Sequence, residues 1–295
     1  MFRRASLVSH ACLAPLLAFL APECAAIAAP AAQAYPLQLL HGSRLLLAAR
    51  VNGHDVQALL DSAAEATILD RAFARRIGLL PGEAVQGQGS GAAAFDAELV
   101  KGVSLEAVGL ELPGQEVAVA DLSDVGRRLL GRPIDVILGR ELFDAARLEI
   151  DAGHRRIRVL AGGEQPRGTR LELVSEHGIE TVPVSIEGHP AVRATFDLGN
   201  GAQVLVSRAY ARRLGLLDDG RAVHREPGGG LGGETRRETF VLKGLVIAGQ
   251  AFTQVAAAID PQASASDLNV GMSVLRYFVL TTDYAGRAVW LRPAR

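Results

Sequence analysis

The chain has 295 residues, of which 49% are hydrophobic and 21% are charged. This composition is typical of a globular protein with enough apolar side chains for one large domain or two of ordinary size. The formal net charge of −1 gives no strong attraction for nucleic acid or for an anionic membrane, so we expect no nucleic-acid partner.

The first 34 residues have the pattern of a secretory signal peptide. Arg3 and Arg4 precede a short apolar run over 11–20, and two A-x-A-like sites place cleavage near residue 28 or 34. The competing interpretation is an uncleaved membrane anchor, for which the apolar run is short. We therefore expect a periplasmic or secreted protein that contacts a membrane only through an uncleaved signal, if at all.

Both cysteines, Cys12 and Cys24, lie in this signal segment. The mature chain is therefore expected to have no disulfide, no cysteine nucleophile and no cysteine ligand for a metal.

The first half of the remaining chain carries short apolar runs separated by turn residues, which favours β-strands. Residues 51–54 predict a hairpin turn, and the run after it ends in an acid followed by small residues, Leu59-Leu60-Asp61-Ser62-Ala63. Residues 70–79 predict a helix that begins at an N-cap, Asp70, and ends at a glycine. A closing apolar run, Val136-Ile137-Leu138-Gly139, precedes another helix-like segment.

The same order returns in the second half. A hairpin turn at 186–189 precedes the run Ala194-Thr195-Phe196-Asp197-Leu198-Gly199, and a helix is predicted over 207–216. The closing run of this copy is Leu268-Asn269-Val270-Gly271. The chain is therefore predicted to contain two homologous halves.

The spacing locates one difference between the halves. Asp61 and Asp197 are 136 positions apart, whereas the glycines that end the two helices, Gly78 and Gly215, are 137 positions apart. The second half therefore has one extra residue just after its acid, near Asn200.

An acid at the end of a buried strand is unfavourable unless a function uses it. One interpretation is that Asp61 and Asp197 each cap a turn by bonding to backbone N–H groups. The matched positions favour a shared centre instead, in which two neighbouring carboxyl groups share one proton and titrate as a unit. Such a pair can take a proton from water and donate one to a carbonyl oxygen.

These motifs resemble those of bacterial retropepsin-like, or pepsin-like two-lobed, aspartyl proteases. That family has an apolar pair before Asp-Thr/Ser-Gly, then a glycine-rich flap, then an apolar pair that ends in glycine before a short helix. Residues 59–63 with 136–139 match one lobe, residues 196–199 with 268–271 match the other, and the likeness covers about residues 37–293.

The resemblance implies a mainly β fold: two homologous acid-protease-like β-barrel lobes in one chain, with one or two short helices per lobe and a cleft between the lobes. The expected divisions are a signal peptide over 1–34, an N-terminal lobe over 35–160, a linker over 161–169 and a C-terminal lobe over 170–295.

The resemblance also implies an aspartic endopeptidase with Asp61 and Asp197 as catalytic residues, a peptide or protein substrate, and no cofactor or metal. Because both lobes belong to one chain, a monomer would suffice to build the site.

The two acid loops depart from the family pattern in different ways. Ala63 replaces a glycine in the first, which requires a negative φ there. Leu198 replaces a threonine or serine in the second, so Ser62 is expected to lack a reciprocal hydroxyl from the other lobe. Ser62, Ala63, Leu198 and Gly199 are predicted to support the acids. Two alternatives stay open: a catalytically weak or inactive peptide-binding module of the same fold, and an envelope structural or interaction protein.

Two glycine-rich stretches, 87–95 and 228–240, are predicted flaps over the cleft, where glycine would permit movement. The alternative is a pair of plain flexible connections. The glycines assigned to the flaps are Gly87, Gly89, Gly91, Gly230, Gly232 and Gly233.

Other chemistries fit these stretches poorly. Residues 228–233 satisfy G-x-G-x-x-G, but a strand-like run follows instead of a helix, so no nucleotide site is expected. Residues 87–91 put serine at the wrong place for a nucleophile elbow. The histidines show neither H-E-x-x-H nor another paired spacing for a metal.

Overall fold

The computed structural model describes residues 33–262 and 266–294. The predicted signal peptide therefore lies outside the described residues except for its last two positions. No helix within the described ranges is long and apolar enough to cross a membrane.

The N-terminal lobe is built on an eight-stranded sheet in the order β2-β3-β4-β9-β5-β8-β7-β6. A further pairing of β3 with β7 closes six of these strands into a barrel. The strands are β2 (Gln38–Leu40), β3 (Arg44–Val51), β4 (His54–Leu60), β5 (Ile68–Asp70), β6 (Glu83–Gln88), β7 (Ala94–Ala107), β8 (Leu110–Ala120) and β9 (Val136–Leu138).

The C-terminal lobe repeats this sheet strand by strand, in the order β13-β14-β15-β20-β16-β19-β18-β17, and a pairing of β14 with β18 closes it. Its strands are β13 (Val174–Glu176), β14 (Ile179–Ile186), β15 (Val192–Phe196), β16 (Val204–Ser207), β17 (His224–Gly228), β18 (Thr235–Ile247), β19 (Gln250–Asp260) and β20 (Leu268–Val270). The predicted duplication and mainly β fold are confirmed.

Short helices occupy matching places in the two lobes. They are α1 (Arg71–Arg76) and α3 (Arg140–Ala145) in the first lobe, and α4 (Arg208–Arg213) and α5 (Met272–Leu275) in the second. Asp70 caps α1 as predicted, since its Oδ1 accepts from the N–H groups of Ala72 and Phe73 at 2.9 and 3.1 Å. Gly78 and Gly215, with φ of +77° and +64°, follow α1 and α4 in the left-handed conformation that glycine favours.

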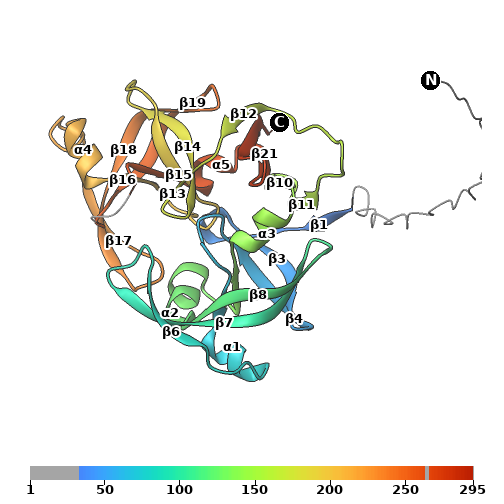
Figure 1. The fold of residues 1–295 in the computed structure, drawn as a ribbon. Helices are drawn as coiled ribbons and strands as arrows, with labels where there is room; N and C mark the ends of the chain where they lie inside the picture. Colours follow the sequence, from blue (N-terminus) through green and yellow to red (C-terminus); the bar gives the residue numbers. More distant parts are fainter. Residues whose placement is uncertain (1–32, 263–265, 295) are drawn as a thin grey trace, which may run out of the picture.

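A third sheet joins the lobes. Its six strands run in the order β1-β11-β10-β21-β22-β12, so three strands of the first half lie on one side of three strands that follow residue 160. They are β1 (Ala34–Pro36), β10 (Leu148–Asp151), β11 (Arg156–Val159), β12 (Thr169–Glu172), β21 (Phe278–Asp283) and β22 (Ala288–Pro293). The central pair is β10 with β21, in which Ile150 lies opposite Leu280. Figure 1 shows the C-terminal lobe, yellow to orange, above the N-terminal lobe, blue to green.

One segment of the N-terminal lobe has no counterpart among the described residues of the C-terminal lobe: α2 (Ser123–Val125) followed by η2 (Gly126–Leu130). Leu122, which directly precedes α2, and Leu130 of η2 pack with Leu59 and Ile137 in an apolar cluster separate from the main core. The strand positions that correspond to Leu59 and Ile137 in the second lobe hold polar residues, Thr195 and Asn269. The lobes are therefore alike in topology but not in the chemistry of this sheet face.

Candidate active site

The two aspartates occupy equivalent positions in the two barrels. Asp61 directly follows β4 and Asp197 directly follows β15. The backbone N–H of each aspartate donates to a carbonyl at the end of the neighbouring parallel strand. Asp61 bonds in this way to Leu138 and Asp197 to Val270, each at 3.0 Å. Both side chains are partly buried. The repeat thus positions each acid by the same backbone pairing.

Ser62 ties the second acid loop to the first. Its buried hydroxyl donates to the carbonyl of Phe196 at 2.8 Å and accepts from the N–H of Leu198 at 2.9 Å. These two backbone groups flank Asp197 in sequence, so one side chain of the first lobe fixes the backbone on both sides of the other acid. Leu198 has no hydroxyl to make the equivalent bonds in return, as its side-chain chemistry predicts.

A different residue of the C-terminal lobe supports the first acid loop. The Tyr284 hydroxyl donates to the Ser62 carbonyl at 3.1 Å, and its ring stacks on Phe143 at 5.2 Å between centroids. Burial raises the pKa of Tyr284 well above its ordinary value, so the hydroxyl remains a donor. Tyr284 follows β21, and the residue that follows the equivalent strand β10 is Ala152. The sequence offered no signal for this contact.

Replacing Ser62 with alanine should destabilise the fold by about 2 kcal/mol, because it leaves a buried carbonyl and a buried N–H without a partner. Urea denaturation of the two proteins measures this difference. Ser175→Ala, on an exposed strand position, is the control and should change stability by less than about 0.5 kcal/mol. Equal stabilities for Ser62→Ala and the parent chain would show that the hydroxyl does not hold the loops.

Residues 63 and 199 occupy equivalent positions in the two acid loops, but only position 63 has room for a methyl group. Ala63 is not among the residues with positive φ, so the methyl group causes no backbone strain there, and its N–H donates to Asp61 Oδ1 at 2.9 Å. A Cβ added at Gly199 would lie 2.7 Å from Asp61 Oδ1 and closer still to Oδ2. Gly199 therefore lies directly against the opposite acid.

Two asparagines outside the predicted site residues hold Asp197. Asn269 Nδ2 donates to Asp197 Oδ2 at 2.7 Å, and the backbone N–H of Asn200 donates to Oδ1 at 2.9 Å. Asn200 lies where the second copy has its extra residue. The sequence could have pointed to Asn269, because it is a polar residue at the centre of the otherwise apolar run 268–270.

The electrostatics of the pair follow from this burial and proximity. Burial, and then the negative charge of Asp197, raise the pKa of Asp61 to about 7. Burial also raises the pKa of Asp197, against the opposing effect of the hydrogen bond from Asn269. The charge of buried Arg44, at the start of β3, favours the ionised form of both acids. The arrangement can hold one proton on two carboxyl groups near neutral pH.

A family model for aspartyl proteases matches the chain over residues 47–142 and again over 182–274, together more than half of its length. The chain belongs to the aspartyl protease family. Each match contains one of the two aspartates and most of one barrel. A search of curated proteins found no match.

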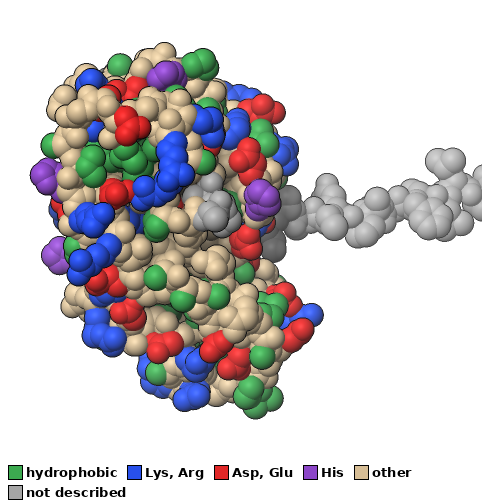
Figure 2. Space-filling model, turned by 90° about the vertical axis from the view of Figure 1, so that its left-hand side faces the viewer, with side chains coloured by type: hydrophobic (Ala, Val, Ile, Leu, Met, Phe, Trp, Pro, Cys, Tyr) green, Lys and Arg blue, Asp and Glu red, His purple; other side chains and the backbone are tan. Residues whose placement is uncertain are grey.

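The glycine-rich stretches of this aspartyl protease family member form the tips of two hairpins, at 89–93 between β6 and β7 and at 229–234 between β17 and β18. The tips contact each other: Gly91 N–H donates to the Leu231 carbonyl at 2.8 Å and Ala93 N–H donates to the Gly232 carbonyl at 3.0 Å. Figure 1 shows β17 reaching toward β6 on the left, and Figure 2 looks onto this side, where the middle of the face is mostly uncharged.

Most of the predicted flap glycines are explained by close approach rather than by mobility alone. A Cβ at four of them would run into the opposite hairpin: Gly89, Gly91, Gly230 and Gly232. Gly87 instead lies under the ring of Phe95 in its own hairpin, and Gly233 has a φ of +96°.

The segment α2–η2 fastens the second hairpin. Arg128 pairs with Asp124 at 2.7 Å, and the same guanidinium donates to the carbonyls of Gly230 at 3.0 Å and Gly228 at 3.5 Å. Leu231 of this hairpin packs against the apolar cluster that α2–η2 covers. The N-terminal lobe therefore holds the flap of the C-terminal lobe closed.

Arg128→Ala should loosen this flap, because two carbonyl contacts and an anchored guanidinium are lost. We expect amide hydrogen exchange in residues 228–233 to become about tenfold faster, as for a contact worth about 1.4 kcal/mol. Exchange measured by mass spectrometry checks this, with exposed Arg127→Ala as the matched control. Unchanged exchange in Arg128→Ala would show that the flap closes without this contact.

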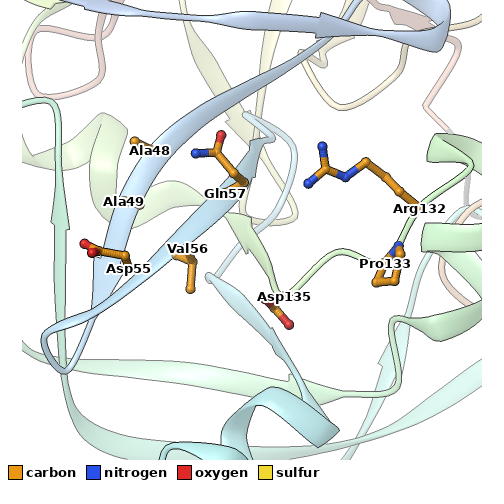
Figure 3. Close-up of a pocket in the computed structure, with 8 residues that line it drawn as sticks. All are labelled: Ala48, Ala49, Asp55, Val56, Gln57, Arg132, Pro133 and Asp135. Atoms are coloured by element: carbon orange, nitrogen blue, oxygen red, sulfur yellow. The ribbon is translucent and has the colours of Figure 1, made fainter.

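An open groove on the N-terminal lobe lies apart from the acids (Figure 3). It is lined by Ala48, Ala49, Asp55, Val56, Gln57, Arg132, Pro133 and Asp135. These residues lie on β3, the first half of β4 and the segment before β9, whereas Asp61 follows the other end of β4. Within residues 33–262 and 266–294, no three His, Cys, Asp or Glu side chains cluster in a way that could hold a metal ion.

Proposed function

We propose that this chain is an aspartic endopeptidase that hydrolyses peptide bonds with a water activated between Asp61 and Asp197. The observation that carries the proposal is the Ser62 hydroxyl, which bonds to both backbone groups flanking Asp197 and so unites the two acid loops in one centre. Family membership supports a hydrolase of this class.

The chemistry needs one ionised and one protonated carboxyl group. The carboxylate takes a proton from water as the water oxygen bonds to the scissile carbonyl carbon, and the carboxylic acid gives its proton to the carbonyl oxygen. The resulting tetrahedral diol then breaks its C–N bond. The nitrogen receives the proton that the first carboxyl group took from water, and a diol hydroxyl gives its proton to the other carboxylate, which restores the starting pair. The raised pKa of Asp61 supplies the protonated partner up to about neutral pH.

The substrate would be a peptide or protein segment that lies between the acids and the paired hairpins. Because the hairpin tips bond to each other, they have to separate before such a segment can enter. The signal-like pattern of residues 1–34 supports a periplasmic or secreted location. The presence of both acid loops in one chain supports action as a monomer.

The test is digestion of a peptide library by the purified protein between about pH 3 and about pH 8, with hydroxylamine present in one arm. We expect internal cleavage with free carboxyl products in both arms, because water attacks directly and no acyl-enzyme forms. Hydroxamate products would show a covalent intermediate and contradict the mechanism.

A peptide-binding module of the same fold is the second candidate, and the missing hydroxyl at Leu198 favours it. It predicts peptide binding, measured by calorimetry, without turnover at any pH in that range.

A further inference from the structure

Asn269 occupies a strand position that its counterpart in the first lobe fills with an apolar side chain. Asn269 lies at the centre of β20, beside Thr195 of β15 and Leu205 of β16. In the first lobe the same slot, beside Leu59 and Ile68, holds Ile137. A partly buried amide in such a slot is unfavourable unless its hydrogen bonds are made, so its partners indicate its role.

Those partners fix which way the amide points. Asn269 Oδ1 accepts from Asn200 Nδ2 at 2.8 Å, which leaves Asn269 Nδ2 directed at Asp197 Oδ2, 2.7 Å away. Asn200 is itself oriented, since its Nδ2 also donates to the Gln203 carbonyl and its Oδ1 accepts from the Ala202 N–H, both at 3.0 Å. The chain of contacts makes Asn269 a donor to the acid.

A donor of this kind distinguishes the two forms of a carboxyl group. An amide NH₂ cannot accept a proton, and its bond to a carboxylate is stronger than its bond to a neutral acid. Asp61 has no equivalent, because Ile137 stands in the corresponding slot and Asp61 Oδ1 is held by the backbone N–H of Ala63. The two acids are therefore in unequal surroundings.

We propose that Asn269, oriented by Asn200, is the positioning residue that keeps Asp197 as the ionised, water-activating carboxylate and leaves the shared proton on Asp61. This inference rests on the proposed function for its catalytic meaning. It gives a role to the extra residue of the second acid loop, which brings Asn200 to the place where it orients Asn269.

The other charged groups that act on Asp197 are Asp61, Arg44 and Arg237, and Arg237 adds to the effect of Asn269. Asp61 faces Asp197 from the first acid loop and competes with it for the proton. Arg44, from β3, acts on both acids. Arg237, from β18, is buried and favours the ionised form of Asp197, in the same direction as Asn269.

The decisive measurement is a carboxyl ¹³C NMR titration of the full chain with one acid present at a time. In Asp61→Asn, Asp197 should titrate at least about one pH unit below the value that Asp61 shows in Asp197→Asn. Adding Asn269→Leu should raise the Asp197 midpoint by about one unit and leave the Asp61 midpoint in place. Equal midpoints for the two acids, or no response of Asp197 to Asn269→Leu, would overturn the inference.

Asn200→Ala is the second variant, since it keeps Asn269 but removes the group that orients it. It should raise the titration midpoint of Asp197 by a smaller amount. An Asp197 midpoint that stays unchanged in both variants would contradict the inference. This titration requires no turnover, so it decides the role of Asn269 separately from the proposed peptidase activity.

The kinetic readout is the pH profile of kcat. Asn269→Leu should shift the acidic limb of this profile upward by about one pH unit. At pH values below the limb kcat should fall about tenfold, whereas near neutral pH it should change little. An equal loss at every pH would assign a merely structural role to Asn269 and contradict the proposal.

Discussion

Asparagine in place of Asp61 or of Asp197 should reduce peptide hydrolysis by about a thousandfold or more, within the upper range for acid–base catalysis. An amide has nearly the shape of a carboxyl group but can neither take a proton from water nor donate one to a carbonyl oxygen. Because the two acids act as a unit, the double variant should be little worse than either single variant. Rates of cleavage of a library-derived peptide, measured across the pH range, check this.

The stability of the variants separates lost chemistry from lost structure. The pKa of Asp61 is raised from its ordinary 3.8 to about 7, so its contribution to stability is fully present below 3.8 and decreases as the pH rises toward 7. Asparagine does not titrate, so Asp61→Asn removes this loss of stability with rising pH. The variant should therefore be at least as stable as the parent chain at neutral pH, as judged by thermal unfolding. Hydrolysis that persists in both single variants would exclude the acid pair as the reacting centre.

The duplicated architecture could be predicted from sequence because it rests on local signals that occur twice. The turn at 51–54, the cap at Asp70 and the glycines at 78 and 215 each follow from the backbone preferences of a few neighbouring residues. The strands between them are short apolar runs. Repetition of these signals in one order specified both barrels and placed the acids at equivalent strand ends.

The long-range contacts could not be predicted, because they depend on residues far apart in sequence. The pairing of β10 with β21, the contact of Tyr284 with Ser62 and the bond from Asn269 to Asp197 all link segments more than 70 positions apart. Each contact forms only when distant segments of the folded chain pack against each other. A polar residue in an apolar run can mark such a contact but does not identify the partner.

The flap glycines show the same limit. Their composition predicts flaps, and the structure places most of them at hairpin tips, where the physical reason for glycine at Gly91 and Gly232 is the backbone of the opposite hairpin. That backbone belongs to the other lobe, more than a hundred residues away. Local sequence can identify a position that requires glycine, whereas the group that requires it is visible only in the folded chain.

The addition of one methyl group at Gly199 should reduce kcat by about a hundredfold, because the added Cβ would overlap the carboxyl group of Asp61. The second acid loop cannot easily move aside, since Ser62 holds the carbonyl of Phe196 and the N–H of Leu198. The Asp61 side chain is then the group that has to turn, and a displacement of about 1 Å at a reacting group is enough for a loss of this size. Steady-state kinetics on Gly199→Ala measure it.

The matched control is Ala63→Gly, at the equivalent position of the first loop. Ala63 has no positive φ, so removing its methyl group should cost stability by about 0.5–1 kcal/mol through the greater freedom of the unfolded chain, and activity should stay within about threefold. Full activity in Gly199→Ala would contradict the packing of Gly199 against Asp61. A large loss in Gly199→Ala with a small one in Ala63→Gly would show that the two acid loops, although built from the same repeat, constrain their opposite acids unequally: Asp61 through contact with Gly199, and Asp197 through the amide of Asn269.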